Sequence, residues 1–319
     1  MAIEVSVIVP NLNSPMIDRT LEALRAQTFD LTRAEVLVVG VDEPGLVTED
    51  RLVRRVTVPV PCSAAQNRNR GIAEARGQIL CFTDADCVPS REWLVRLTAP
   101  FADAEVAVVG GGVDVDASNY WTLCDNLSWF YRFLSTAPAG ERAHLPSLNL
   151  CVRRNVAGRV GGFDEGFPNA AGEDTEWTAR LRSAGVALHF EPNAVVRHCP
   201  PRSTFAQIWR HGYLYGRYSS KLQPELGRQL SSSDAFWLPR SWWLLLLLSP
   251  LFGALATARV LGALAKGAHA RELATWKAMP GIWLTKVAWC VGASNALRTG
   301  LERTARRTTV EDHQPVQQR

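Results

Sequence analysis

The chain has 319 residues, of which 47% are hydrophobic and 21% charged, and this composition excludes a disordered chain, a collagen-like repeat and a disulfide-stapled miniprotein. Lysine and arginine total 35 against 31 acids, and the resulting net charge of +4 is too small to indicate a nucleic-acid partner by itself. Seven cysteines, an odd number with no C-x-x-C pair, predict a reduced compartment and no structural zinc. Because no secretory signal opens the sequence, we expect the first part of the chain to lie in the cytoplasm.

Residues 1–225 alternate short β-branched runs with amphipathic stretches, which predicts an α/β domain with a mainly parallel sheet. The first strand, at 3–9, is expected to stop at Pro10, and Asn13 or Ser14 is expected to cap the helix that follows. Later strands are expected at 36–39, 79–82, 106–109 and 194–197, and helices at 63–76, 120–134 and 173–183. No internal repeat interrupts this order.

The composition changes from about residue 237. Residues 242–258 carry no charged side chain and include five consecutive leucines, which favours membrane contact over a buried core helix. Residues 279–297 are apolar apart from Lys286 and fit either a span or a helix in the membrane plane. We therefore expect hydrophobic, membrane-associated helices over 236–300 and a polar tail over 301–319. Positive charges between the two apolar stretches leave the number of spans open.

The segment Asp84-Ala85-Asp86 follows the expected strand at 79–82, at the edge where open α/β sheets bind ligands. Two carboxylates one residue apart can share a hard divalent cation, whereas an isolated D-x-D is more often a turn. The preceding apolar strand favours the cation here.

Two further patterns are ambiguous on their own. Glu173-Asp174 begins an expected helix, where acids either stabilise the helix start or serve as a general base. Arg68 lies early in a helix and could meet a phosphate, while a lone histidine such as His198 is more often structural.

Seven motifs in chain order resemble the family 2 glycosyltransferases: V-S-V-I-V-P-N-L-N, E-V-L-V-V, R-N-R-G-I-A-E-A-R-G, F-T-D-A-D, G-G-F-D-E, G-E-D-T-E-W with R-L-R-S-A-G, and V-R-H. The resemblance covers residues 3–218. The resemblance implies the GT-A fold, with a nucleotide-sugar-binding half over 1–105 and an acceptor half over 106–225. It also implies inverting transfer of a sugar from a nucleotide donor.

On the donor side, the resemblance assigns roles by position. Pro10, Asn11 and Asn13 match the end of the family's first strand, against the base and ribose. Arg68 matches a helix arginine near the nucleotide, and Asp84 matches the acid that contacts the ribose and the water shell of the metal.

The metal and the acceptor side are assigned in the same way. Asp86 matches the acid that ligates Mn²⁺ or Mg²⁺, and His198 matches a histidine that joins the metal in some members. Asp174 matches the base on the acceptor side, and Glu173 is its usual neighbour. From its place at a helix start, we expect a lowered pKa for Asp174.

Two departures from the family pattern bear on specificity. Many members read uracil with an Asp-Asp pair after the second strand, whereas this chain has Gly40-Val41-Asp42, and Asp42 is predicted to act one position later. The processive motif Q-x-x-R-W is absent from Gln207-Ile208-Trp209-Arg210, which favours a single transfer.

The function implied is metal-assisted transfer from a nucleotide-diphosphate sugar, with a UDP-sugar favoured, to a hydroxyl of a glycan or lipid-linked acceptor. The expected place is the cytoplasmic face of the cell membrane. The main alternative is a non-catalytic, membrane-tethered protein that binds a nucleotide sugar. A glycoside hydrolase is a weaker alternative, because it also uses two carboxylates but needs no acids that bind a metal ion. A nucleotidyltransferase is weaker too, because this chain lacks a glycine-rich basic loop after its first strand.

Overall fold

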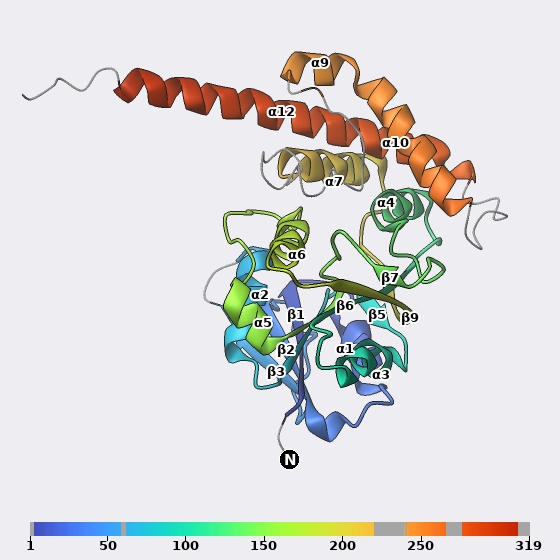
Figure 1. Ribbon diagram of the computed structural model, residues 1–319. Coiled ribbons are helices and arrows are strands. Elements are labelled where there is room, and N and C mark those ends of the chain that lie inside the picture. Colours follow the sequence, from blue (N-terminus) through green and yellow to red (C-terminus); the bar gives the residue numbers. More distant parts are fainter. Residues whose placement is uncertain (1–2, 59–61, 220–238, 240, 266–275, 312–319) are drawn as a thin grey trace, which may run out of the picture.

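The computed structural model of the chain describes residues 3–58, 62–219, 239, 241–265 and 276–311. In these residues nine strands form one sheet, and a layer of helices lies over one end of it (Figure 1). The sheet has the order β3-β2-β1-β4-β8-β6-β9-β5, with β7 paired to β9. The strands are β1 (Val5–Leu12), β2 (Ala34–Val41), β3 (Val53–Thr57), β4 (Ile79–Thr83), β5 (Cys87–Pro89), β6 (Val108–Val115), β7 (Gly140–Glu141), β8 (Asn149–Arg153) and β9 (Leu188–His198).

The two halves of the sheet differ in strand direction. Strands β3, β2, β1 and β4 run parallel, whereas β8 is antiparallel to both β4 and β6. Strand β6 is parallel to β9, and β5 and β7 are antiparallel to it. The prediction of an α/β domain is confirmed, but the sheet is mixed and is mainly parallel only in its first half.

Helices cover both faces of the sheet and extend beyond it (Figure 1). Helix α2 begins as the sequence predicts, because Ser63 and Gln66 form a reciprocal capping box. The helices are α1 (Ile17–Arg25), α2 (Ala64–Glu74), α3 (Trp93–Thr98), α4 (Tyr120–Phe130), α5 (Arg154–Val160), α6 (Glu173–Ser183), α7 (Phe205–Arg217), α9 (Trp242–Leu247), α10 (Ser249–Leu264) and α12 (Met279–Glu311), with short 3₁₀ turns at Leu31–Arg33 and Ala99–Ala102.

The end of strand β1 corrects two sequence predictions. The strand continues through Pro10 to Leu12, because pairing with β4 ends at Ile8 and Pro10 then has a neighbouring strand on one side alone. Helix α1 begins at Ile17 without a side-chain cap. The polar residues expected to cap it shape the loop instead, as the site below shows.

A disulfide joins Cys81 and Cys151, which face each other on the antiparallel strands β4 and β8. A cysteine count that predicts a reduced compartment does not foresee this bond. Direct cross-strand pairing brings the two sulfurs together, and only the strand order reveals it.

The C-terminal helices pack directly on the α/β domain. Helix α12 lies along α7, where a Cβ atom at Gly216 would collide with the carbonyl oxygen of Trp289, and one at Gly292 with that of Tyr213. Apolar side chains of α4, α10 and α12 form a second core that includes Leu127, Val260 and Ile282.

The apolar stretch at 242–258 is not one helix. It divides into α9 and α10, with Pro250 in the first turn of α10. Among the described residues, no helix is both long and apolar enough to cross a bilayer. Helix α12 continues to Glu311, into the segment predicted as a polar tail, and the predicted boundary between 225 and 236 falls outside the described residues.

Candidate active site

One large cavity opens at the carboxyl ends of β1 and β4, beneath α6 and α7. Its volume is about 720 Å³. Nine of the ten site residues that the sequence predicts line it: Pro10, Asn11, Asn13, Arg68, Asp84, Asp86, Glu173, Asp174 and His198. Residues that are up to 188 positions apart in sequence, from Pro10 to His198, therefore meet at one place.

Asp42 is the predicted residue that the structure does not bring to this cavity. Its carboxylate accepts the backbone N–H groups of Leu46, at 3.1 Å, and Val47, at 2.9 Å, and lies 3.9 Å from Arg55. The side chain is only 2% exposed. Asp42 thus organises its own loop, and its role toward a nucleobase stays a prediction.

The loop after β1 is held by its own polar side chains. Asn11 donates from Nδ2 to the Val41 carbonyl at 3.0 Å, and Asn13 has a φ of 55° and accepts the N–H of Glu43 at 2.8 Å. Ser14 donates to the carbonyl of Ala85 at 2.8 Å, which ties this loop to the Asp84–Asp86 turn. These contacts explain why Asn13 and Ser14 do not cap α1.

Arg68 connects the two sides of the cavity. Its guanidinium, 2% exposed, pairs with Asp84 at 2.7 Å and with Glu173 at 2.8 Å. Burial disfavours the charge, but the two carboxylates outweigh it and raise the pKa of Arg68. The arginine therefore remains charged, and it fixes the donor-side acid relative to the start of α6.

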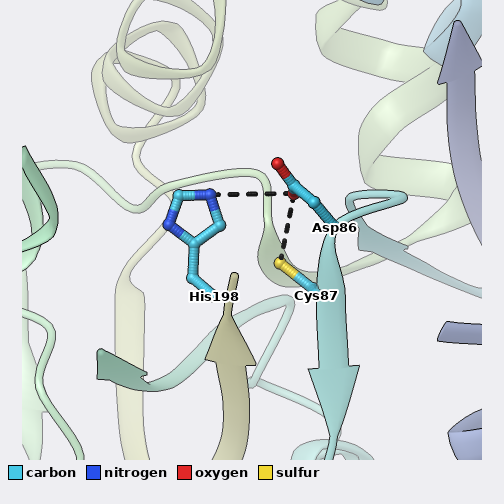
Figure 2. A group of neighbouring side chains, drawn as sticks. All are labelled: Asp86, Cys87 and His198. Carbon is cyan, nitrogen blue, oxygen red and sulfur yellow. Dashed lines mark hydrogen bonds and ion pairs between the residues drawn. The ribbon is translucent and has the colours of Figure 1, made fainter. Parts of the chain in front are cut away.

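Asp86 and His198 form a pair suited to a cation (Figure 2). His198 Nε2 lies 3.7 Å from Asp86 Oδ1, and its Nδ1 lies 2.6 Å from Asn126 Oδ1. Because Asn126 donates its amide to the His198 carbonyl, its oxygen faces the ring, so Nδ1 carries the proton.

The protonation states leave two electron-pair donors facing each other. Burial lowers the pKa of His198 to about 3, so the ring is neutral at pH 7 with the Nε2 lone pair toward Asp86. Burial also raises the pKa of Asp86, whose carboxylate gains from a nearby positive ion. An oxygen and an imidazole nitrogen suit Mn²⁺. Cys87 contacts Asp86 at 4.0 Å, but burial raises the pKa of its thiol well above the usual value and keeps it protonated.

Glu173 and Asp174 begin helix α6, as the sequence predicts, but the expected lowered pKa of Asp174 is wrong. Burial raises the pKa of Asp174 and outweighs Arg68 and the N–H groups of Ser147 and Thr175. The helix start supplies only a small opposing effect. Burial likewise raises the pKa of Glu173 to about 7, although Arg68 opposes the shift. A raised pKa makes Asp174 a stronger base than the sequence suggested.

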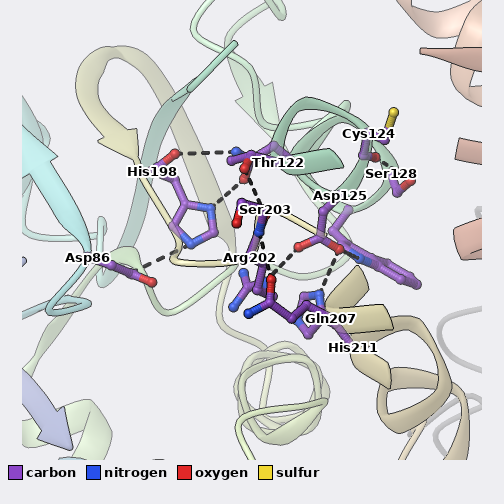
Figure 3. Close-up of polar contacts among 12 residues, drawn as sticks. Asp86, Thr122, Cys124, Asp125, Ser128, His198, Arg202, Ser203, Gln207 and His211 are labelled. Carbon is purple, nitrogen blue, oxygen red and sulfur yellow. Dashed lines mark hydrogen bonds and ion pairs between the residues drawn. The ribbon is translucent and has the colours of Figure 1, made fainter. Parts of the chain in front are cut away.

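A polar network beside Asp86 and His198 was not predicted from the sequence (Figure 3). Asp125, 1% exposed, accepts from Arg202 Nε at 2.8 Å, from His211 Nδ1 at 2.7 Å and from Trp129 Nε1 at 2.9 Å. Burial opposes ionisation of Asp125, but Arg202 and His211 outweigh it and hold its pKa well below the usual range. Arg202 and His211 line the cavity, so Asp125 positions two nitrogen groups there.

Weak sequence signals could have pointed to this network. Gly212 and Gly216 mark the face of α7 that packs on α12, so His211 and Tyr215, each one residue before a glycine, share a neighbouring face. Asp125 is the one charged residue of helix α4, and a buried acid requires a charged partner. The partner's position is set by tertiary packing and could not be read from spacing.

Comparisons with known proteins identify the family of this chain. The sequence model of the family described as "Glycosyltransferase like family 2" matches residues 3–212. The chain therefore belongs to this family, and it is a glycosyltransferase.

Two relatives are also named as glycosyltransferases. Glycosyltransferase AglE of Haloferax volcanii is 30% identical over 225 residues, which cover 67% of this chain and 72% of that protein. Probable glycosyltransferase YdaM of Bacillus subtilis is 26% identical over 243 residues, which cover 67% of this chain and 54% of that protein.

The fold is shared with solved structures. The mannosyltransferase PcManGT from Pyrobaculum calidifontis, in complex with GDP-Man and Mn²⁺, superimposes with a TM-score of 0.59 at 21% identity over 93% of this chain and 88% of that one. GalNAc-T7 with UDP, GalNAc and Mn²⁺ gives 0.51 at 16% identity over 73% and 51%. At these identities the likeness confirms the GT-A fold and nothing finer.

Proposed function

We propose that this chain transfers one sugar, with inversion, from a nucleotide-diphosphate donor to a hydroxyl of a glycan or lipid-linked acceptor, with help from Mn²⁺ or Mg²⁺. The observation that carries the proposal is that Asp86, His198 and Asp174 line the same cavity. A protein that only binds the donor needs no buried base on the opposite wall.

The donor is placed along the wall that runs from Asn11 to Asp86. Asp86 and His198 would hold the metal ion, which supplies Lewis-acid stabilisation of the departing diphosphate. Arg202, whose pKa is raised by Asp125 and Asp86 against the effect of burial, keeps its charge and adds a second cation for the diphosphate.

Asp174 supplies the base. As the acceptor oxygen forms its bond to the anomeric carbon, the hydroxyl proton passes to the Asp174 carboxylate. The bond from that carbon to the diphosphate oxygen breaks on the opposite face, and the electron pair leaves with the nucleotide. Attack opposite the leaving group inverts the configuration.

A UDP-sugar is the proposed donor, and a GDP-sugar is its principal competitor because PcManGT was solved with GDP-Man. Isothermal titration of the full-length chain with UDP, GDP and dTDP, in Mn²⁺ and then in EDTA, tests the donor part of the proposal. We expect metal-dependent binding of one nucleotide, lost in Asp86→Asn. Equal binding of all three with and without metal would contradict it.

The transfer itself is tested with sugar donors that carry the nucleotide found to bind. Anomeric protons of the product, followed by NMR, should show configuration opposite to that of the donor. Retained configuration would reject the inverting mechanism, and tight donor binding without product from any acceptor would favour the non-catalytic alternative.

The proposed place is the cytoplasmic face of the cell membrane, with contact through the outer face of α9 and α10. This face exposes Trp243, Leu246, Leu247, Leu251 and Leu255, which are between 43% and 68% exposed. Such a surface suits insertion into the headgroup region of a bilayer without crossing it.

Flotation with liposomes of anionic phospholipid tests this contact. Leu247→Glu combined with Leu251→Glu should abolish flotation, whereas Val95→Glu, at an apolar residue of α3 that is 41% exposed, should not. Flotation that survives the double substitution would place the membrane contact elsewhere.

A further inference from the structure

A second, smaller cavity adjoins the first and shares lining residues with it. Its volume is about 160 Å³, and it shares Phe130, Asp174 and Tyr215 with the larger cavity. Its remaining walls come from the end of α4, from the turn before α6 and from α12. The carboxylate of Asp174 therefore borders both cavities, so a molecule in the smaller one lies next to the proposed base.

Positive charge predominates in this smaller cavity. Arg132 and Lys286 line it, and Asp174 is the one acid among the described residues that do. Lys286 donates to the Ser128 carbonyl at 2.6 Å and lies 4.2 Å from the centre of the Trp129 ring, which fixes its charge at the wall.

Aromatic side chains form the other walls. The rings of Trp129 and Tyr215 stack with their centres 4.6 Å apart, and Trp289 of α12 also lines the cavity. Rigid aromatic faces suit the apolar face of a sugar ring. Trp129 donates to Asp125, so the stacked pair is held by the same network that positions Arg202 and His211.

We propose that the smaller cavity is the acceptor subsite and that the acceptor carries a phosphate or carboxylate group near the hydroxyl that Asp174 deprotonates. This inference rests on the proposed function. The acceptor ring lies against Tyr215 and Trp289, and its anionic group faces Arg132 and Lys286. Helix α12 thereby gives two binding residues, Lys286 and Trp289, to the catalytic domain.

Three probes that differ only at C6 test the proposal by titration calorimetry: methyl β-glucoside, methyl β-glucuronide and methyl β-glucoside 6-phosphate. The full-length protein is first saturated with Mg²⁺ and the nucleotide that it binds, so that anions cannot enter the donor cavity. We expect at least one anionic probe to bind about tenfold more tightly than the neutral one, since hydrogen bonds between charged partners are stronger than those between neutral ones. The anionic probe that binds more tightly shows whether the acceptor carries a carboxylate or a phosphate.

Two variants locate the effect. Arg132→Gln and Lys286→Met should each remove about tenfold of affinity for the preferred anion and leave the neutral probe unchanged. Arg182→Gln and Lys277→Gln, at exposed residues of α6 and of the segment before α12, are matched charge controls and should change neither. If Lys286→Met melts early because its contact with Trp129 is lost, Arg132→Gln decides the question.

The proposal is overturned if the wild-type protein shows no preference for either anion, or if the preference survives in a folded Arg132→Gln variant. Nucleotide binding is titrated separately, so the two failures are distinguishable. A wild-type protein that binds no nucleotide contradicts the proposed function, whereas normal nucleotide binding without an anion preference contradicts only the acceptor subsite.

Discussion

The proposed donor edge and the proposed acceptor edge of the large cavity are built in different ways. On the donor edge, Asn11 lies near the end of β1, and Asp84 and Asp86 follow the end of the neighbouring strand β4, so the hydrogen-bonded sheet sets their spacing. On the acceptor edge, side chains from α4, α6, α7 and α12 meet only because those helices pack together. The donor edge is therefore positioned by backbone, and the acceptor edge by side-chain contacts that a single substitution can remove.

The largest expected effect is on the base at the acceptor edge. Asp174→Asn should lower the transfer rate by about 10³-fold, within the range that general bases contribute, because the amide cannot take the hydroxyl proton. Donor affinity should stay close to wild type. Asp164→Asn, at an exposed acid before α6, is the control. Full transfer activity in a folded Asp174→Asn protein would remove Asp174 from the mechanism.

Arg68 tests whether the two edges depend on one another. Arg68→Met leaves Glu173 and Asp84 without their cation, and we expect a loss of about 3–5 kcal/mol in the free energy of unfolding in urea. Arg70→Met, two residues further along α2, breaks an exposed pair with Glu74 and should cost less than about 1 kcal/mol.

A double variant separates charge from packing. If the uncompensated carboxylate causes the loss, Arg68→Met with Glu173→Gln should be more stable than Arg68→Met alone. Equal stabilities for the single and double variants would show that the packing of Arg68, including its contact with the ring of Phe163, matters more than its charge.

The same difference explains how much the sequence could predict. Asp84, Asp86 and Glu173-Asp174 lie at element ends that local patterns locate, but the family resemblance assigned the roles, and nine of the ten residues it assigned line one cavity. Asp125, Arg202 and His211 come from three segments, and nothing in their spacing shows that they meet. Lys286 appeared only as an interruption of an apolar stretch, because its contact with Ser128 depends on how α12 packs. Asp42 is the one predicted residue outside the cavity, because its carboxylate accepts N–H groups of its own loop, and no sequence pattern indicates that contact.

Glu173 should make stability depend on pH. Its pKa is raised from 4.5 to about 7 by burial, so the folded state holds a proton that the unfolded state has lost between these values. Stability from this group is full below pH 4.5 and is lost as the pH rises through 7. The difference is a few kcal/mol at most, at about 1.4 kcal/mol for each pKa unit.

Thermal unfolding of wild type and Glu173→Gln from pH 4 to 8 measures this difference. We expect the variant to gain stability relative to wild type as the pH rises, because the amide carries no charge. Glu105→Gln, at an exposed acid, should run parallel to wild type. A parallel profile for Glu173→Gln as well would assign the pH dependence to other groups.

The smallest effect is expected at Asp125, which acts through its neighbours. Asp125→Asn keeps the shape of the side chain but removes the charge that holds Arg202 and His211. We expect nucleotide affinity to fall by about tenfold, the usual range for one charged hydrogen bond, while the rate at saturating donor changes less. A positioning role thus predicts a change in KM for the donor that exceeds the change in kcat.

The stacking of Trp129 gives a second readout for Asp125, because the indole donates to the same carboxylate. If the acceptor edge is held by side-chain contacts, Asp125→Asn should also weaken binding of the preferred anionic probe in the smaller cavity. Asp18→Asn, at an exposed acid of α1, should leave both affinities unchanged. Loss of donor affinity with unchanged probe binding would mean that the two edges are held independently, and that Tyr215 and Lys286 keep Trp129 in place without Asp125.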